Sequence, residues 1–233
     1  MRGKTLDSDI RWLEEGLQEV SWESTVERYR EPLKKFYQGM LEDLRNVDRE
    51  GIKPGNRRYK SRPFEKGLAK LFGKVLGNED IIDESCWLTV KDSYKSCFSF
   101  GKRSKNGTKM EVDIRIPKKI TTTKNHNMFY IEAKYNLDMN EFGSALMKSI
   151  LTEKEENSRF YIVSLRREGK CDYRELCKKE PFKRYIDGVV YFGPKYDPEL
   201  RDVVKLLQEI EESFSRGKSW EGNPFSSQRV EHL

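Results

Sequence analysis

Two short strand-like segments of the chain carry charged side chains at alternate positions. In MFYIEAKY, residues 128–135, alternation along a strand places Tyr130, Glu132 and Lys134 on one face. In MEVDIRIP, residues 110–117, charged and aliphatic side chains point to opposite faces: Glu111, Asp113 and Arg115 against Val112, Ile114 and Ile116. If the two segments pair as a hairpin, the sequence predicts that Asp113 and Glu132 meet on one face, beside Lys134.

Two carboxylates brought together repel each other, and each prefers to be protonated unless a cation lies between them. A hard divalent ion bound through oxygen atoms suits such a pair, and Mg²⁺ commonly uses one or two carboxylates together with phosphate oxygens and water. A lysine close to that ion can hold an attacking water molecule and neutralise charge that develops on a phosphate. Asp113, Glu132 and Lys134 therefore indicate metal-assisted phosphate chemistry.

The same residues have a simpler interpretation. An E-x-K triplet in a strand is common, and Lys134 could form an exposed cross-strand salt bridge with Asp113 or Glu132 on a solvated face of the sheet. Glu111 is a rival for the first carboxylate, but it would need a different register between the two strands.

Hydrophobic periodicity predicts the elements that position these residues. Residues 6–50 carry apolar side chains at helical spacing in two helices. A third helix runs from Pro63 to about Gly77, with a buried stripe formed by Phe64, Leu68, Leu71, Phe72 and Val75. Strands are expected at residues 86–101, 108–117, 127–136, 158–166 and 187–193, and helices at about 140–156 and 198–217. This order predicts an α/β (α+β) fold, with a mixed central sheet flanked by helices.

Asp113, followed after 18 residues by Glu132, Ala133 and Lys134, resembles the motif of the PD-(D/E)XK nuclease superfamily. The resemblance extends in element order over roughly residues 62–192, with a glutamate-bearing helix before the first strand and a helix directly after the E-x-K strand. Val112 stands where the family name has proline. The resemblance implies a restriction-endonuclease-like sheet preceded by a helical N-terminal part.

The resemblance also implies a Mg²⁺-dependent phosphodiesterase. Asp113, Glu132 and the main-chain carbonyl of Ala133 would bind the metal ion, and Lys134 would position the nucleophilic water. Many members add an acid from the preceding helix, for which Glu65 is the candidate, because it lies one position from the buried stripe. The alternative for Glu65 is a solvated glutamate that the helix dipole favours in the first turn.

Positive charge is concentrated around the predicted site. The chain has a formal net charge of +6, and residues 101–134 alone contain nine lysines or arginines against three acidic residues. Such a surface would neutralise nucleic-acid phosphates and give salt-dependent affinity, whereas the alternative is solubilising surface charge. Base contacts are expected from the loops 101–109 and 118–127. The expected DNA contacts are Arg57, Arg58, Lys102, Arg103, Lys105, Asn106, Lys118, Lys119, Lys124 and Lys148.

Other chemistries lack the residues that they need. The four cysteines form no C-x-x-C pair and lie away from the two histidines in sequence, so neither a structural zinc site nor histidine-based hydrolysis is expected. No GxxxxGK[ST] phosphate-binding loop occurs. The N-terminal sequence has no signal-peptide core and no apolar run reaches transmembrane length, which predicts a soluble, cytoplasmic protein.

Size and organisation most resemble a type II restriction endonuclease, a homodimer that cuts double-stranded DNA at a palindrome. The predicted division is a helical part at residues 1–60 that dimerises or clasps DNA, a catalytic core at 61–216 and an irregular tail at 217–233. Two alternatives stay open. One is a structure-specific or repair nuclease of the same superfamily, and the other is a DNA-binding protein that keeps the fold without catalysis.

Overall fold

A computed structural model describes residues 6–50, 61–91, 93–94, 102–104, 107–117, 128–154 and 157–218. The α-helices within these ranges are α1 (Leu6–Gln18), α2 (Glu27–Arg49), α3 (Ser61–Leu76), α4 (Met139–Leu151), α5 (Tyr173–Cys177) and α6 (Arg201–Lys218). The strands are β1 (Asp83–Thr89), β2 (Lys102–Ser104), β3 (Gly107–Ile116), β4 (Met128–Leu137), β5 (Ser158–Arg167) and β6 (Gly188–Tyr191). None of these helices is long and apolar enough to cross a membrane.

The strands form one mixed sheet in the order β1-β3-β4-β5-β6, with β2 paired to β3. The pairs β1–β3, β2–β3 and β3–β4 are antiparallel, and the pairs β4–β5 and β5–β6 are parallel. The predicted hairpin of β3 and β4 is present, with Ile114 opposite Ile131 and Ile116 opposite Phe129. The predicted α/β fold with a mixed central sheet flanked by helices is confirmed.

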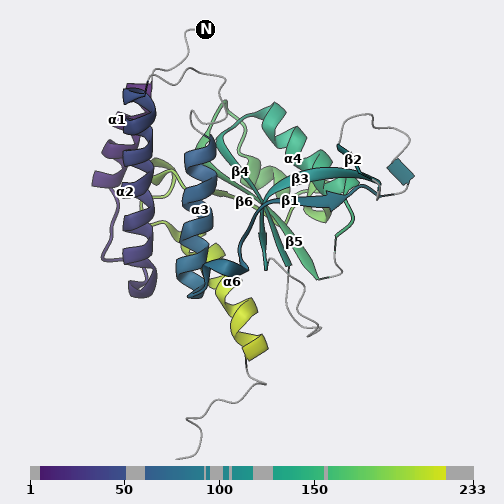
Figure 1. Ribbon diagram of the computed structural model, residues 1–233. Coiled ribbons are helices and arrows are strands. Elements are labelled where there is room, and N and C mark those ends of the chain that lie inside the picture. Colours follow the sequence, from purple (N-terminus) through teal and green to yellow (C-terminus); the bar gives the residue numbers. More distant parts are fainter. Residues whose placement is uncertain are drawn as a thin grey trace, which may run out of the picture.

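The helices α1, α2, α3 and α6 pack on one face of the sheet. Figure 1 shows α1, α2 and α3, in purple and blue, side by side. Their apolar side chains join Ile131 and Ala133 of β4 in one hydrophobic cluster. In the predicted stripe of α3, four side chains are buried and Val75 is partly buried. The two N-terminal helices therefore share a core with the sheet.

Helices α4 and α5 pack on the opposite face. There Tyr130 of β4 meets Phe142 and Ala145 of α4 in a second hydrophobic cluster. Helix α4 begins one residue after the strand, because the side chain of Asp138 caps it by accepting a hydrogen bond from the main-chain N–H of Glu141 at 2.8 Å. This tight connection returns the chain over β4, the strand that carries Glu132.

Some expected boundaries are wrong. The strand expected over residues 86–101 ends at Thr89, and Val90 then forms an isolated bridge with Thr152. The same bridge ends α4 at Leu151, earlier than residue 156. Within the expected base-contacting loop 101–109, residues 102–104 and 107–109 belong instead to β2 and β3. Residues 219–233 of the expected tail and the loop 118–127 lie outside the described residues.

Candidate active site

Asp113 and Glu132 lie together where strands β3 and β4 part. The pairing of these strands ends at Ile114 and Ile131, and one step further in the same register Asp113 would face Glu132. Instead of a main-chain pair, the N–H of Ala133 donates a hydrogen bond to Oδ2 of Asp113 at 2.8 Å. The Asp113 side chain thus takes over the acceptor role of a strand carbonyl, and its carboxylate is fixed between the diverging strands.

The neighbouring strand β1 is also distorted at this level. Ser85 would pair with Asp113, but that position is missing from the ladder and Ser85 has φ of 61°, in the left-handed region. On the far side of the distortion Val112 packs in the cluster with α4, whereas Ile114 and Ile116 pack in the cluster with α3. The predicted single aliphatic face of β3 is therefore wrong at Val112, because alternation assumes a regular strand.

The ammonium of Lys134 lies between the carboxylates. Its Nζ is 3.0 Å from Oε2 of Glu132, 3.9 Å from Oδ2 of Asp113 and 3.5 Å from Oε2 of Glu141. The Glu132 side chain is 0% exposed and the Lys134 side chain is 15% exposed. The simpler interpretation, an exposed salt bridge on a solvated face, does not fit this burial, since taking charges out of water is costly.

Lys148, which was expected to contact DNA, lies against Glu132. Its Nζ donates hydrogen bonds to both carboxylate oxygens, at 2.8 Å to Oε1 and 2.7 Å to Oε2. Glu141 and Lys148 are seven residues apart on α4, which is two turns, so both reach the site from one face of the helix. From the sequence, Glu141 was not expected in the site, and Lys148 was expected to contact DNA and not Glu132. The seven-residue spacing of Glu141 and Lys148, with the small, buried Ala145 between them, could have indicated that both side chains face the E-x-K strand.

The charges of the cluster change its protonation. Burial raises the pKa of Asp113, the Glu132 carboxylate raises it further, and Lys134 and Lys148 lower it, with a net value of about 7. Burial alone would lower the pKa of Lys134, but the negative charges of Glu132 and Asp113 outweigh burial and raise it above its ordinary value. Lys134 is therefore a cation at neutral pH, and Asp113 is poised between its two protonation states.

Glu65 approaches the site from α3, which packs against β4. It is half-buried, and its negative charge contributes to the raised pKa of Asp113. Within the described ranges, no three or more His, Cys, Asp or Glu side chains are grouped closely enough to hold a metal ion. Glu65 is therefore near the pair of carboxylates, but it does not join Asp113 and Glu132 in one direct ligand set.

Two of the remaining expected DNA contacts lie within the described residues. Lys102 and Arg103 lie on β2, which pairs with the same strand β3 that carries Asp113. The others lie outside the described residues: Arg57, Arg58, Lys105, Asn106, Lys118, Lys119 and Lys124.

The oxygen donors of the site can be compared with those that Mg²⁺ uses in proteins. Asp113 and Glu132 offer hard oxygen donors, and Mg²⁺ binds proteins through one or two carboxylates while it keeps several water ligands. Burial raises the pKa of Asp113, and repulsion from the neighbouring Glu132 carboxylate raises it further. A divalent cation would relieve that repulsion, so the residues present fit the metal.

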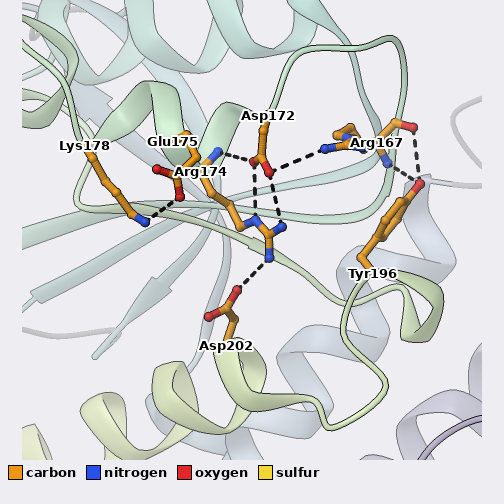
Figure 2. Close-up of polar contacts among 7 residues, drawn as sticks. All are labelled: Arg167, Asp172, Arg174, Glu175, Lys178, Tyr196 and Asp202. Atoms are coloured by element: carbon orange, nitrogen blue, oxygen red, sulfur yellow. Dashed lines mark hydrogen bonds and ion pairs between the residues drawn. The ribbon is translucent and has the colours of Figure 1, made fainter.

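A second charged region lies towards the opposite edge of the sheet. A groove of about 700 Å³ is bordered by α5, β6 and α6. Arg174 lies between Asp172 and Asp202, and Lys178 pairs with Glu175 (Figure 2). The N–O distances of Arg174 are 3.2 Å to Asp172 and 2.9 Å to Asp202. Each carboxylate of this network already has a cation. The network ties the start of α5 to α6.

No protein-family model matches the chain, and no curated protein matches it at a significant level. A proposal for its function therefore depends on the geometry and the charges of the Asp113, Glu132 and Lys134 cluster.

Proposed function

We propose that this chain is a Mg²⁺-dependent endonuclease that hydrolyses phosphodiester bonds of double-stranded DNA, with an active site like that of the PD-(D/E)XK superfamily. The observation that carries the proposal is the buried contact of Asp113 and Glu132 with Lys134 at the point where β3 and β4 part. Burying so many charges costs stability, and such costs are most readily understood where the charges serve chemistry.

Each residue has a role in the proposed mechanism. Asp113, Glu132 and the main-chain carbonyl of Ala133 would hold Mg²⁺, which when bound would act as a Lewis acid towards phosphate oxygens and water. Lys134, which stays charged, hydrogen-bonds the attacking water and stabilises the negative charge that builds on the phosphate. The lysine- and arginine-rich segments around β2 and β3 bind the phosphate backbone of the DNA.

Within this class we propose a type II restriction endonuclease that acts as a homodimer, because a palindrome has to be read twice and cut on two strands. Incubation of the protein with a plasmid of mixed sequence and Mg²⁺ tests the proposal. Discrete fragments are expected. A smear, or preference for junctions, would indicate the structure-specific or repair nuclease. A mobility shift without cleavage would indicate a non-catalytic DNA-binding protein and contradict the proposal.

Metal binding should depend on pH through Asp113. Because the pKa of this carboxyl is raised from 3.8 to about 7, a proton competes with Mg²⁺ below neutrality, and the apparent affinity should fall by up to about tenfold per pH unit there. Calorimetric titration with Mg²⁺ between about pH 6 and pH 8 measures this slope. A pH-independent affinity would contradict the role of Asp113 as a ligand.

The stability of the metal-free protein should depend on pH in the opposite direction to the Mg²⁺ affinity, and should fall as the pH rises. The folded-state pKa of Asp113 lies above its ordinary value, so its protonated form favours the fold. That contribution is complete below about pH 4 and is lost as the pH rises through about 7. In EDTA, Asp113→Asn should remove this component of the pH dependence of the melting temperature.

Replacing Glu65 with glutamine tests its proposed role as a helper on α3. If Glu65 holds the metal ion through a water molecule, Glu65→Gln should lower the cleavage rate and raise the Mg²⁺ concentration needed for half-maximal rate by about tenfold or more, since one indirect contact is lost. Exposed Glu84 of β1 provides the control, Glu84→Gln. A Mg²⁺ titration identical to that of wild type would leave Glu65 as a solvated first-turn glutamate.

A further inference from the structure

Glu132 has two ammonium groups on one carboxylate. Nζ of Lys148 contacts both oxygens, at 2.8 and 2.7 Å, and Nζ of Lys134 contacts Oε2 at 3.0 Å. The Lys148 side chain is 17% exposed. Its ammonium is thus directed into the site and is held by Glu132. A lysine that only contacts DNA would instead extend into solvent.

The carboxylate of Glu132 needs these cations because it is buried. Removing an unpaired charge from water is costly, and a buried carboxylate remains ionised only beside positive charge. A divalent cation bound to Glu132 would supply the same neutralisation as an ammonium. Lys148 contacts both oxygens, so a metal that takes one of them has to displace part of this contact.

We propose that Lys148 is a positioning residue that fixes the carboxylate of Glu132 and competes with the divalent metal as its counter-ion. The inference rests on the proposed metal site, and it deepens that proposal by assigning a role to a residue of α4. Lys148 differs from Lys134 in that it comes from a helix and contacts neither Asp113 nor Glu141 in the described part of the chain.

This competition predicts an unusual response to metal. In Lys148→Met, Glu132 loses its bidentate partner, so the melting temperature in EDTA should fall by about 5 °C or more. Saturating Mg²⁺ or Mn²⁺ should restore most of that loss, because the metal replaces the missing positive charge. The affinity for Mg²⁺, measured by calorimetry without DNA, should rise about tenfold, since the metal no longer displaces an ammonium.

Two further variants make the test specific. Lys148→Arg keeps the charge and should respond to metal like the wild type. Lys91 is the matched control, because it is a half-buried lysine whose Nζ donates to the main-chain carbonyl of Ile150 on the same helix at 2.7 Å, away from the carboxylates. Lys91→Met should lose some stability and recover none of it with Mg²⁺.

The outcomes separate this inference from the nuclease proposal. An equal loss of melting temperature with and without Mg²⁺ would overturn the inference and leave Lys148 a structural partner of Glu132. Weaker DNA binding with an unchanged metal response would overturn it in favour of a phosphate contact. Metal rescue of Lys148→Met would support the inference even if the wild type cut no DNA, and only the nuclease proposal would then fail. If neither protein bound metal, both proposals would be wrong.

Discussion

Asp113→Asn is expected to lower Mg²⁺-dependent cleavage by at least about a thousandfold without unfolding the protein. A thousandfold loss corresponds to about 4 kcal/mol of transition-state stabilisation, which is within the several kcal/mol that a metal Lewis acid supplies. Asparagine lacks the negative charge that Mg²⁺ requires. Its side-chain carbonyl can still accept the hydrogen bond that the main-chain N–H of Ala133 gives to Asp113.

The stability of this variant is part of the prediction. Burial and the nearby Glu132 raise the pKa of Asp113 to about 7, so a neutral side chain suits this position at least as well as a carboxylate. Asp113→Asn should therefore melt at the same temperature as the wild type in EDTA at neutral pH, or at a higher one. Lost cleavage in this variant cannot then be attributed to lost structure.

Glu132→Gln should be equally inactive but less stable. It removes the carboxylate that pairs with both Lys134 and Lys148, and leaves two half-buried ammonium groups without that partner. Breaking a buried pair in this way typically costs about 3–5 kcal/mol. Comparing the two variants separates the chemistry of the site from its contribution to the fold.

The measurement is cleavage of labelled DNA at saturating enzyme and Mg²⁺, beside DNA binding with Ca²⁺ in place of Mg²⁺. Ca²⁺ accepts looser geometry and more ligands, so it should support binding by the wild type without cleavage. Both carboxylate variants should still bind DNA, since the basic segments are unchanged. Cleavage at the wild-type rate by either variant would refute the assignment of Asp113 and Glu132 as metal ligands.

The position of Asp113 and Glu132 beside Lys134 could be predicted from the sequence for a physical reason. Side chains alternate strictly along a regular strand, and an antiparallel hairpin pairs segments that are close in sequence. Two short periodic runs therefore fix which charged residues share a face. A helical periodicity predicted α3 in the same way, because Phe64, Leu68 and Leu71 recur at the spacing of one helix face.

The prediction was wrong where a local distortion or a long-range contact decides the structure. Nothing in the residue types marks Ser85 for a left-handed conformation, yet this distortion carries Val112 to the other face. The contact of Lys148 with Glu132 depends on where the crossover helix α4 packs, and helical periodicity gives the face of a helix but not its neighbour. Burial of Glu132 follows from that same packing, so the sequence left an exposed salt bridge open as an alternative.

Lys134→Met is expected to reduce the rate of the chemical step by at least about a hundredfold while DNA affinity stays near that of the wild type. The magnitude is that of removing one well-placed electrostatic stabiliser, about 2.7–4 kcal/mol. The raised pKa of Lys134 keeps it protonated at neutral pH, so it cannot act as a general base there. Its contribution has to come from its charge and from a hydrogen bond to the attacking water.

The alternative, that Lys134 is only a counter-ion, predicts the opposite result. Lys148 would remain on Glu132 after Lys134 is replaced, and Asp113 and Glu132 would bind Mg²⁺ more tightly, with little change in the rate at saturating metal. Single-turnover cleavage at saturating enzyme and Mg²⁺ distinguishes these cases, because it separates chemistry from binding. Lys91→Met, which removes a half-buried lysine away from the carboxylates, should cleave at the wild-type rate. If Lys134→Met cleaved within about threefold of the wild type, a difference of under 1 kcal/mol, Lys134 would have no role in the chemical step, and the nuclease proposal would depend on the two carboxylates alone.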